Sequence, residues 1–172
     1  MSRIEEITGE LQALMAGVEQ ARAHAAAADG QAQEIGRRAA GAGFAAVAAG
    51  MARVRQAIGE IQGGLGGLAG AIGEATKVAA AVPREASPEA AIAGLAPVQS
   101  AVTAAREAAS GVAGQVDEAQ RLVGMLLQGG QPGPLLATLA SIKQVLVLLV
   151  QRTGNAGQLV DVAIGEARQL GN

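Results

Sequence analysis

Residues 58–72, Ile-Gly-Glu-Ile-Gln-Gly-Gly-Leu-Gly-Gly-Leu-Ala-Gly-Ala-Ile, decide the fold of this chain. Their large apolar side chains recur in steps that alternate between three and four residues, at Ile58, Ile61, Leu65, Leu68 and Ile72. This spacing puts them on one face of an α-helix, at the a and d positions of a heptad repeat. Because the period runs unbroken through the glycines, the stretch is predicted to be helical rather than a glycine-rich loop.

The same heptad period extends in both directions and covers most of the 172 residues. It breaks at three places that carry turn signals, which are Gly41-Ala-Gly43, the stretch from Pro83 to Pro88, and the stretch from Gln128 to Pro134. Ser87 followed by Pro88 is typical of a helix N-terminus. The pattern therefore predicts four helices, at about residues 3–40, 44–82, 88–128 and 134–170.

Short turns between long helices predict antiparallel neighbours. The predicted fold class is all-α, with two tandem helical hairpins at residues 1–86 and 87–172. The four helices either form one four-helix bundle or open into an elongated, coiled-coil-like dimer. Two weak points stand out: Pro97 is expected to kink the third helix or delay its start, and residues 153–157 are a possible break in the fourth.

The two halves also resemble each other. A shift of 84 residues aligns the first helix with the third, so that Leu11 meets Leu95. A shift of 88 residues aligns the second helix with the fourth, so that Arg55 meets Lys143. Ala-rich heptad helices also align by chance, so the polar matches carry the interpretation of a tandem duplication.

The composition excludes several functional classes. With no Cys and one His, the chain has no disulfide framework, thiol nucleophile or histidine metal cluster. The formal net charge of -2 and the single aromatic residue argue against a nucleic-acid binder, which needs clustered basic residues or stacking rings. We expect no cofactor, no metal and no small-molecule substrate.

Targeting signals are weak. Residues 1–10 contain no apolar stretch of the kind that a signal peptide needs. The longest apolar run, Val145 to Val150, is far shorter than the roughly 20 residues of a membrane span. We therefore expect no transmembrane segment and a cytoplasmic protein, with export without a signal peptide as an alternative.

The glycines of the second helix form a stripe of their own. They fall at heptad positions b and f, opposite the apolar face, at Gly59, Gly63, Gly66, Gly70 and Gly73. Each costs about 1 kcal/mol in a helix relative to Ala, so the stripe is either a weak, mobile segment or a smooth face that another helix approaches closely. The second interpretation makes the five glycines candidate partner-binding residues.

Two apolar features have alternative interpretations as well. Phe44 follows the first turn and either caps the end of the bundle core or anchors a partner. Residues 145–150 are apolar on all faces, so they lie either at the centre of the bundle or on a docking surface.

The candidates for catalysis are poor. The glycines of residues 63–70 lack the Gly-Lys-Ser/Thr ending and the preceding strand of a phosphate-binding loop. His24 falls at a heptad flank with no second histidine and no carboxylate on its face. Glu5, Glu6 and Glu10 suit the first turns of a helix, where acidic residues favour the helix dipole. We therefore expect no enzyme activity.

Three stretches carry a resemblance to a known family: Ser87-Pro-Glu-Ala-Ala-Ile-Ala-Gly-Leu-Ala-Pro-Val98, the turn from Gln128 to Pro134, and Ile142-Lys-Gln-Val-Leu-Val-Leu148. In them the chain resembles a family of uncharacterised Ala-rich actinobacterial proteins, which supplies no activity or site. A looser resemblance is to the helical hairpins exported by type VII secretion systems, whose Trp-x-Gly turn corresponds to Gly41-Ala-Gly-Phe44. The chain has neither that Trp nor the Tyr of their export signal.

Many a and d positions are Ala, which buries less apolar area than Leu, so a second copy or a partner would add buried surface. We therefore expect a non-enzymatic interaction or scaffold protein that binds itself or another helical protein. One alternative is a cargo or adaptor of a type VII-like secretion or polymorphic-toxin system. Another is a lipid or granule coat that resembles phasins, which also use Ala-rich helices.

Overall fold

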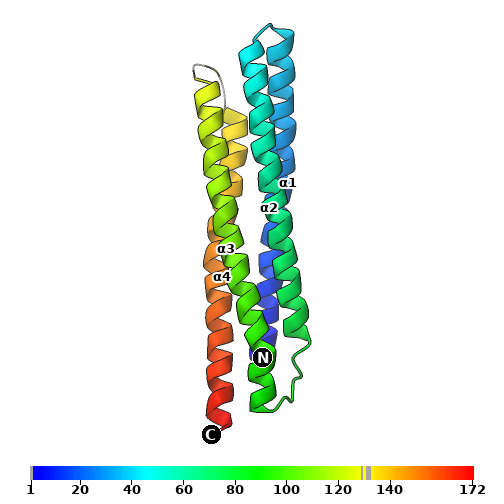
Figure 1. Cartoon of the computed structure of the whole chain (residues 1–172), viewed down its shortest axis with the longest axis vertical. Helices are drawn as coiled ribbons and strands as arrows, with labels where there is room; N and C mark the ends of the chain where they lie inside the picture. Colours follow the sequence, from blue (N-terminus) through cyan, green and yellow to red (C-terminus); the bar gives the residue numbers. More distant parts are fainter. Residues whose placement is uncertain (1, 129, 131–132) are drawn as a thin grey trace.

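The computed structural model describes residues 2–128, 130 and 133–172 and contains four long helices. They are α1 (Arg3–Gly41), α2 (Ala45–Ala80), α3 (Pro88–Leu126) and α4 (Gly133–Leu170). Each helix packs against two others, in the order α1, α2, α3, α4 around a square, and α4 closes against α1. The predicted all-α fold with four antiparallel helices is confirmed, and the two hairpins fold together as one bundle (Figure 1).

The two hairpins are staggered along the bundle axis. Both termini and the linker between α2 and α3 lie at one end, and the turn of the first hairpin lies at the other (Figure 1). Gly50 of α2 faces Leu126, the last residue of α3, so residues 45–49 of α2 extend beyond the end of that helix. The tip of the first hairpin therefore projects past its neighbours.

The core consists of the a and d positions of all four helices, as the heptad pattern predicts. Large and small side chains alternate between neighbours. The first half of α1 contributes Ile7, Leu11 and Leu14, where the buried residues of α4 are mostly smaller: Thr153, Ala156, Val160 and Ala163, together with Ile164. The second half of α1 is Ala at its buried positions, and there α4 contributes a row of large residues: Leu135, Leu139, Ile142, Leu146 and Leu149. Small residues opposite large ones keep the core filled while the helices stay close.

Local signals explain where the helices start and end. Ser2 caps α1 in a capping box, because its hydroxyl accepts from the Glu5 N–H while the Glu5 carboxylate accepts from the Ser2 N–H. Ser87 caps α3 and Pro88 follows as its first residue. Gly43 ends the first hairpin's turn with φ +84°, a conformation that favours glycine.

The expected delay of α3 at Pro97 and the expected break in α4 are wrong, whereas a kink at Pro97 stays a prediction. Pro97 neither delays nor breaks α3, which runs unbroken from Pro88 to Leu126, with Pro97 on its exposed side. Residues 153–157 do not break α4 either, which runs from Gly133 to Leu170. Thr153 is buried there, and its hydroxyl donates to the carbonyl of Val150. Residues 129, 131 and 132 of the turn from Gln128 to Pro134 lie outside the described residues.

The two predicted shifts reproduce the register of the core. Adding 84 to each buried residue of α1 from Leu11 to Ala39 gives a buried residue of α3, and adding 88 to those of α2 from Met51 to Ala79 gives buried residues of α4. Each hairpin also has one ion pair between its helices. Asp29 pairs with Arg55 at 3.0 Å in the first hairpin, and Asp117 pairs with Lys143 at 2.7 Å in the second.

Candidate functional site

The glycine stripe lies on the outer face of α2. Gly59, Gly63, Gly70 and Gly73 are exposed and Gly66 is half-buried. A Cβ added at the first four in sequence would meet no atom within 4 Å, and at Gly73 it would meet only the Met15 methyl at 4.0 Å. The chain's own bundle therefore leaves this face open, and its use by a partner stays a prediction.

Phe44 lies at the projecting tip of the first hairpin. Its backbone N–H donates to the carbonyl of Ala39 at 2.8 Å, while its side chain is 64% exposed. The expectation that Phe44 caps the core is wrong, because the tip of the first hairpin projects past α3 and leaves this side chain exposed. Phe44 precedes Gly59 by 15 residues, about 22 Å along the helix, so the structure does not bring it together with the glycine stripe.

The apolar run in α4 is not enclosed by the bundle. Leu146 and Leu149 are buried, but Val147 is 44% and Leu148 57% exposed. The expectation that residues 145–150 lie at the bundle centre is therefore wrong for these two side chains. In a square bundle each helix has only two neighbours, so its outer positions face solvent whatever residue occupies them.

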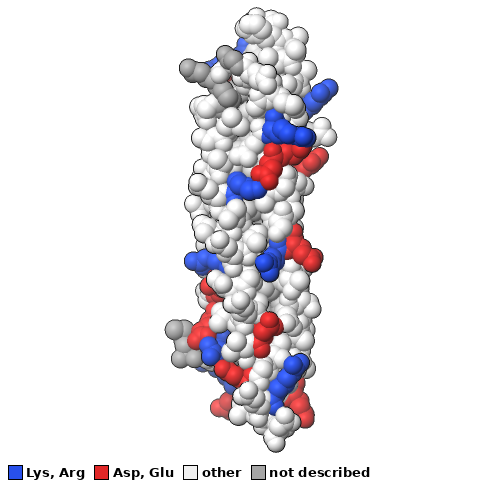
Figure 2. Space-filling view, turned by 90° about the vertical axis from the view of Figure 1, so that its left-hand side faces the viewer, with Lys and Arg blue, Asp and Glu red and all other residues white. Residues whose placement is uncertain are grey.

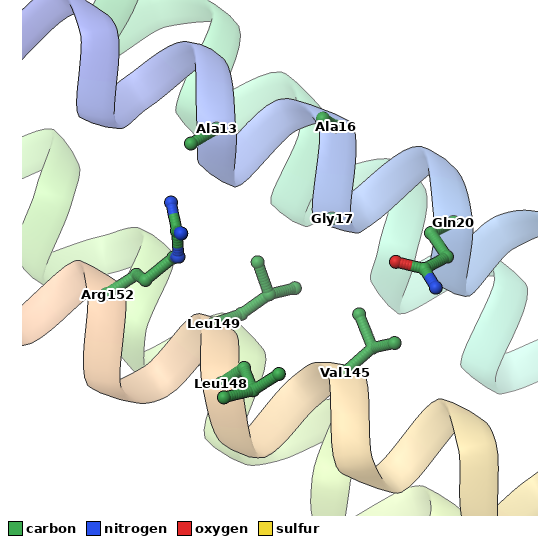
Figure 3. A pocket seen from close by; sticks show the side chains of 8 residues that line it. All are labelled: Ala13, Ala16, Gly17, Gln20, Val145, Leu148, Leu149 and Arg152. Atoms are coloured by element: carbon green, nitrogen blue, oxygen red, sulfur yellow. The ribbon is translucent and has the colours of Figure 1, made fainter.

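Leu148 borders a groove of about 340 Å³ between α1 and α4 (Figure 3). Val145, Leu148 and Leu149 line it from α4, and the small residues Ala13, Ala16 and Gly17 form its other wall. Gln20 and Arg152 lie toward its two ends. Arg152 approaches the Glu10 carboxylate at 3.6 Å, so one end is polar and the middle apolar. The groove offers contact area and no arrangement of reactive groups.

The interfaces between the two hairpins contain glycines that sequence reasoning missed. Gly17, Gly50, Gly64 and Gly94 all occupy heptad position g, and each faces a d residue of the neighbouring hairpin. The atoms nearest to their added Cβ positions belong to Leu149, Leu126, Val112 and Val82, at 2.7, 2.3, 2.6 and 2.9 Å. The sequence signal that could have identified these four glycines is their position directly before an a residue of the heptad.

We call these two interfaces the α2/α3 seam and the α1/α4 seam. Gly50 and Gly64 of α2 receive side chains of α3 in the α2/α3 seam, and Gly94 of α3 receives Val82 of the linker that follows α2. Gly17 lies in the α1/α4 seam, where it receives Leu149. The α1/α4 seam also borders a second cavity, of about 640 Å³, near Gln31 and Leu135. The Oε1 atoms of Gln31 and of Gln115, which follows it by 84 residues, are buried without hydrogen-bond partners.

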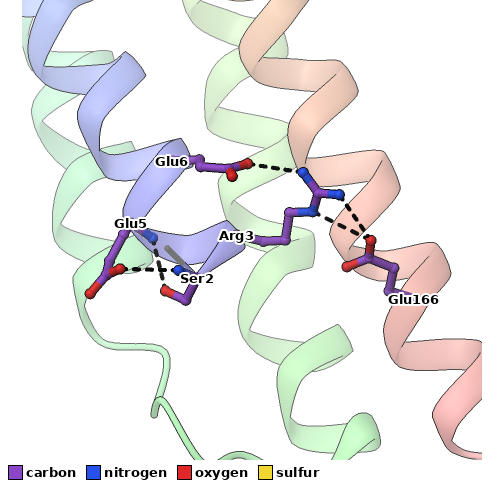
Figure 4. Close-up of polar contacts among 5 residues, drawn as sticks. All are labelled: Ser2, Arg3, Glu5, Glu6 and Glu166. Carbon is purple, nitrogen blue, oxygen red and sulfur yellow. Dashed lines mark hydrogen bonds and ion pairs between the residues drawn. The ribbon is translucent and has the colours of Figure 1, made fainter.

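Charged side chains close the lower end of the α1/α4 seam (Figure 4). Arg3 lies between Glu6 at 3.0 Å and Glu166 of α4 at 3.2 Å, and these two carboxylates raise its pKa, Glu166 the more strongly. The Ser2 N–H and, more weakly, Arg84 of the linker lower the pKa of Glu5. Over the face shown in Figure 2, basic and acidic side chains are interspersed rather than gathered by sign.

The candidate catalytic residues are dispersed. Glu5 serves the capping box, Glu6 pairs with Arg3 and Glu10 pairs with Arg152, so the three carboxylates have separate structural partners. His24 is half-buried on α1. Among the described residues, no three His, Asp or Glu side chains gather as a group that would hold a metal ion.

Comparison with protein families gives a match over the second hairpin. Residues 86–172 match a family of unknown function, DUF6244. The chain belongs to this family. The DUF6244 match begins one residue before Ser87, the N-cap of α3, and covers all of α3 and α4. The expected membership of an uncharacterised family is therefore confirmed. Searches of curated proteins and of solved structures found no match to the chain.

The second helix of the matched region, α4, contains a long apolar stretch. It contains an 18-residue stretch of mean hydropathy 1.8, which is long and apolar enough to cross a membrane by length and composition. In the bundle, one third of that stretch is buried. A core helix of a soluble protein can be equally long and apolar, so this property alone does not decide whether α4 lies in a membrane or in a soluble bundle.

Proposed function

We propose that this DUF6244 protein is a non-enzymatic scaffold that binds a helical partner. The exposed Leu148 beside the small-residue wall of the α1/α4 groove carries the proposal. The a and d residues of the four helices are already packed inside the bundle, so a partner that binds the closed molecule has to contact an outer surface. Of the outer surfaces, this groove combines exposed large apolar side chains with a concave shape.

The occupant that fits this groove is an amphipathic helix. Ala13, Ala16 and Gly17 let a helix approach closely, as small residues do at helix contacts. The partner would place large apolar side chains against Leu148 and Val145 and polar ones near Arg152. The glycine stripe of α2 and Phe44 are further contact surfaces in this proposal, and neither is needed for the groove to act.

The test compares two exposed apolar residues of α4. Leu148 and Val162 are 57% and 46% exposed and occupy the same heptad position, but only Leu148 lines the groove. The tagged protein is purified from its native host after mild cross-linking, as wild type, Leu148→Gln and Val162→Gln. A helical protein recovered in stoichiometric amount with wild type and Val162→Gln should be lost with Leu148→Gln. A truncated hot-spot side chain typically costs about 2 kcal/mol or more of binding energy.

Equal recovery by all three proteins contradicts binding in the groove. Recovery of only the protein itself in every case contradicts a separate helical partner.

A lipid or granule coat is a second candidate, because the outer part of the apolar stretch of α4 is not buried. It predicts that the wild-type protein floats with liposomes in a density gradient and that Val147→Lys with Leu148→Lys stays at the bottom. We also propose a cytoplasmic location and an actinobacterial origin, with a role in type VII-like secretion as the alternative. The secretion role predicts protein in the culture medium that disappears when the secretion ATPase is deleted.

A further inference from the structure

The α1/α4 seam is the one seam of the square that no connection of the chain crosses. The turn at residues 42–44 joins α1 to α2, the linker at residues 81–87 joins α2 to α3, and residues 127–132 join α3 to α4. Separating α1 from α4 therefore leaves each of the three connections between its own pair of packed helices. Opening the bundle at any other seam would have to move a connected pair apart.

The packing of the α1/α4 seam is also the more open of the two inter-hairpin seams. One glycine, Gly17, receives a side chain across it, compared with Gly50 and Gly64 across the α2/α3 seam, next to which Gly94 also receives Val82 of the linker. Cavities of about 340 and 640 Å³ lie along it. Side chains that border a void lack attractive contacts on that side, so less contact is lost when this seam separates.

The flanking g positions differ in the same sense. In the α2/α3 seam the g residues of the two helices are Gly, Ala, Val or Leu, apart from Gln115. In the α1/α4 seam the g residues include two ion pairs, Arg3 with Glu166 and Glu10 with Arg152. Exposed ion pairs such as these cost little to separate in water.

An opened seam has to be covered again. It exposes the large core residues of α4, which are Leu135, Leu139, Ile142, Leu146 and Leu149. In the closed bundle they pack where the buried positions of α1 are Ala. A covering helix therefore needs an Ala face, a glycine opposite Leu149, and a basic and an acidic residue placed to meet Glu166 and Arg152. The α1 helix of a second copy has all of these features.

We infer that a second copy of this chain binds by reciprocal exchange across the α1/α4 seam. The α1 helix of each copy packs against the α4 helix of the other, while the α2/α3 seam stays within each chain. The exchange re-forms Arg3 with Glu166, Glu10 with Arg152 and Gly17 with Leu149 between copies. This inference rests on the proposed scaffold function for the role of such a dimer. It deepens that proposal by naming one partner and its binding mode.

The test uses the full chain, whose lack of cysteine allows clean disulfide mapping. One variant combines Gly17→Cys with Leu149→Cys across the α1/α4 seam, where the new Cβ at residue 17 points at the side chain that is removed. A matched control combines Gly50→Cys with Leu126→Cys across the α2/α3 seam, where removal of Leu126 also frees the space that the new side chain needs. Each is refolded at low and high concentration, separated by size with light scattering, and oxidised. Circular dichroism of the reduced proteins verifies the helical fold.

The expected result is a dimer fraction that rises with concentration, as mass action requires. The Gly17→Cys/Leu149→Cys bond joins two chains on a denaturing, non-reducing gel, while the Gly50→Cys/Leu126→Cys bond stays within one chain. Monomer alone at every concentration overturns the inference. So does a dimer in which both bonds stay within one chain, which indicates surface contact. A dimer in which both bonds join two chains indicates exchange of whole hairpins and overturns the seam assignment.

A second measurement removes the dependence on disulfide geometry. Chains carrying only Arg3→Cys are refolded together with chains carrying only Glu166→Cys and treated with a short bis-maleimide cross-linker. Exchange predicts a cross-linked pair with one chain of each kind, and the absence of that product in a dimeric sample overturns the inference. Partner capture that depends on Leu148 is measured separately, so a monomeric protein that still binds a helical partner defeats the exchange alone.

Discussion

The two seams between the hairpins perform the same geometric task with different chemistry. The α2/α3 seam is interlocked, because Leu126 and Val112 of α3 insert at glycines of α2 and Val82 of the linker inserts at Gly94 of α3. The α1/α4 seam has one such contact, two cavities along its length and ion pairs at its flanks. The comparison teaches that helices with nearly identical a and d spacing can pack tightly or more openly, depending on the residues at their g positions.

The largest expected effect concerns the interlocked seam. Gly64→Leu should lower the free energy of unfolding by about 1–3 kcal/mol, because its Cβ would lie 2.6 Å from Cγ2 of the buried, β-branched Val112. Gly63→Leu is the matched control, since a side chain there meets open space. It should be neutral or stabilise the helix by up to about 1 kcal/mol. Urea denaturation followed by circular dichroism measures both, and equal effects would refute the interlocked packing.

A smaller effect is expected in the open seam. Gly17→Leu should destabilise the protein by roughly 1 kcal/mol, at the low end of the overpacking range. The atom nearest to the new Cβ is Cδ2 of Leu149, the end of a flexible side chain that borders the groove. The same denaturation experiment decides the matter. If Gly17→Leu costs as much as Gly64→Leu, the two seams do not differ in tightness.

The ion pairs that flank the open seam should contribute less still. A double-mutant cycle with Glu10→Gln and Arg152→Gln should give a coupling free energy below about 1 kcal/mol that shrinks at high salt. The Glu10 and Arg152 side chains approach to 3.6 Å and are 24% and 48% exposed, so solvent screens them. A large coupling that persists in high salt would mean that this seam is held electrostatically.

The smallest expected effect is an acid dependence at the end of α1. The pKa of Glu5 is lowered in the folded protein, so the stability it contributes is present above the ordinary value of 4.5 and is lost as the pH falls through its folded pKa. Glu5→Gln should therefore unfold more easily than wild type at neutral pH and approach it in acid. Urea midpoints measured across this range test the prediction. A constant difference at all pH values would show that the Glu5 carboxylate does not act through its charge.

The heptad period was sufficient to predict the helices, their order and the core register. It succeeded through residues 58–72 because helix periodicity depends on the spacing of large side chains, and glycines at outer positions do not disturb that spacing. Pro97 misled the prediction, since one proline on the solvent side of a long helix is compatible with continuous packing of Leu95 and Val98.

The surface features were not predictable in the same way. The exposure of Phe44 depends on the axial stagger of the two hairpins. Sliding one hairpin by a whole heptad leaves the pattern of a and d positions matched, so the pattern does not reveal the stagger. The exposure of Val147 and Leu148 depends on how many neighbours α4 has. The glycines at position g were visible in the sequence, but separating them from outer glycines such as Gly63 requires knowing which flank of each helix faces the other hairpin.

The Ala-rich second half of α1 has a thermal consequence. Unfolding raises the heat capacity of ordinary proteins by about 12–15 cal/mol/K per residue, mainly because apolar surface becomes hydrated. A core whose buried positions in this region are Ala21, Ala25, Ala28, Ala32 and Ala39 hides less such surface per residue. The heat-capacity increment of this protein should therefore be small. A small increment flattens the curve of stability against temperature, so the bundle should lose little stability on cooling.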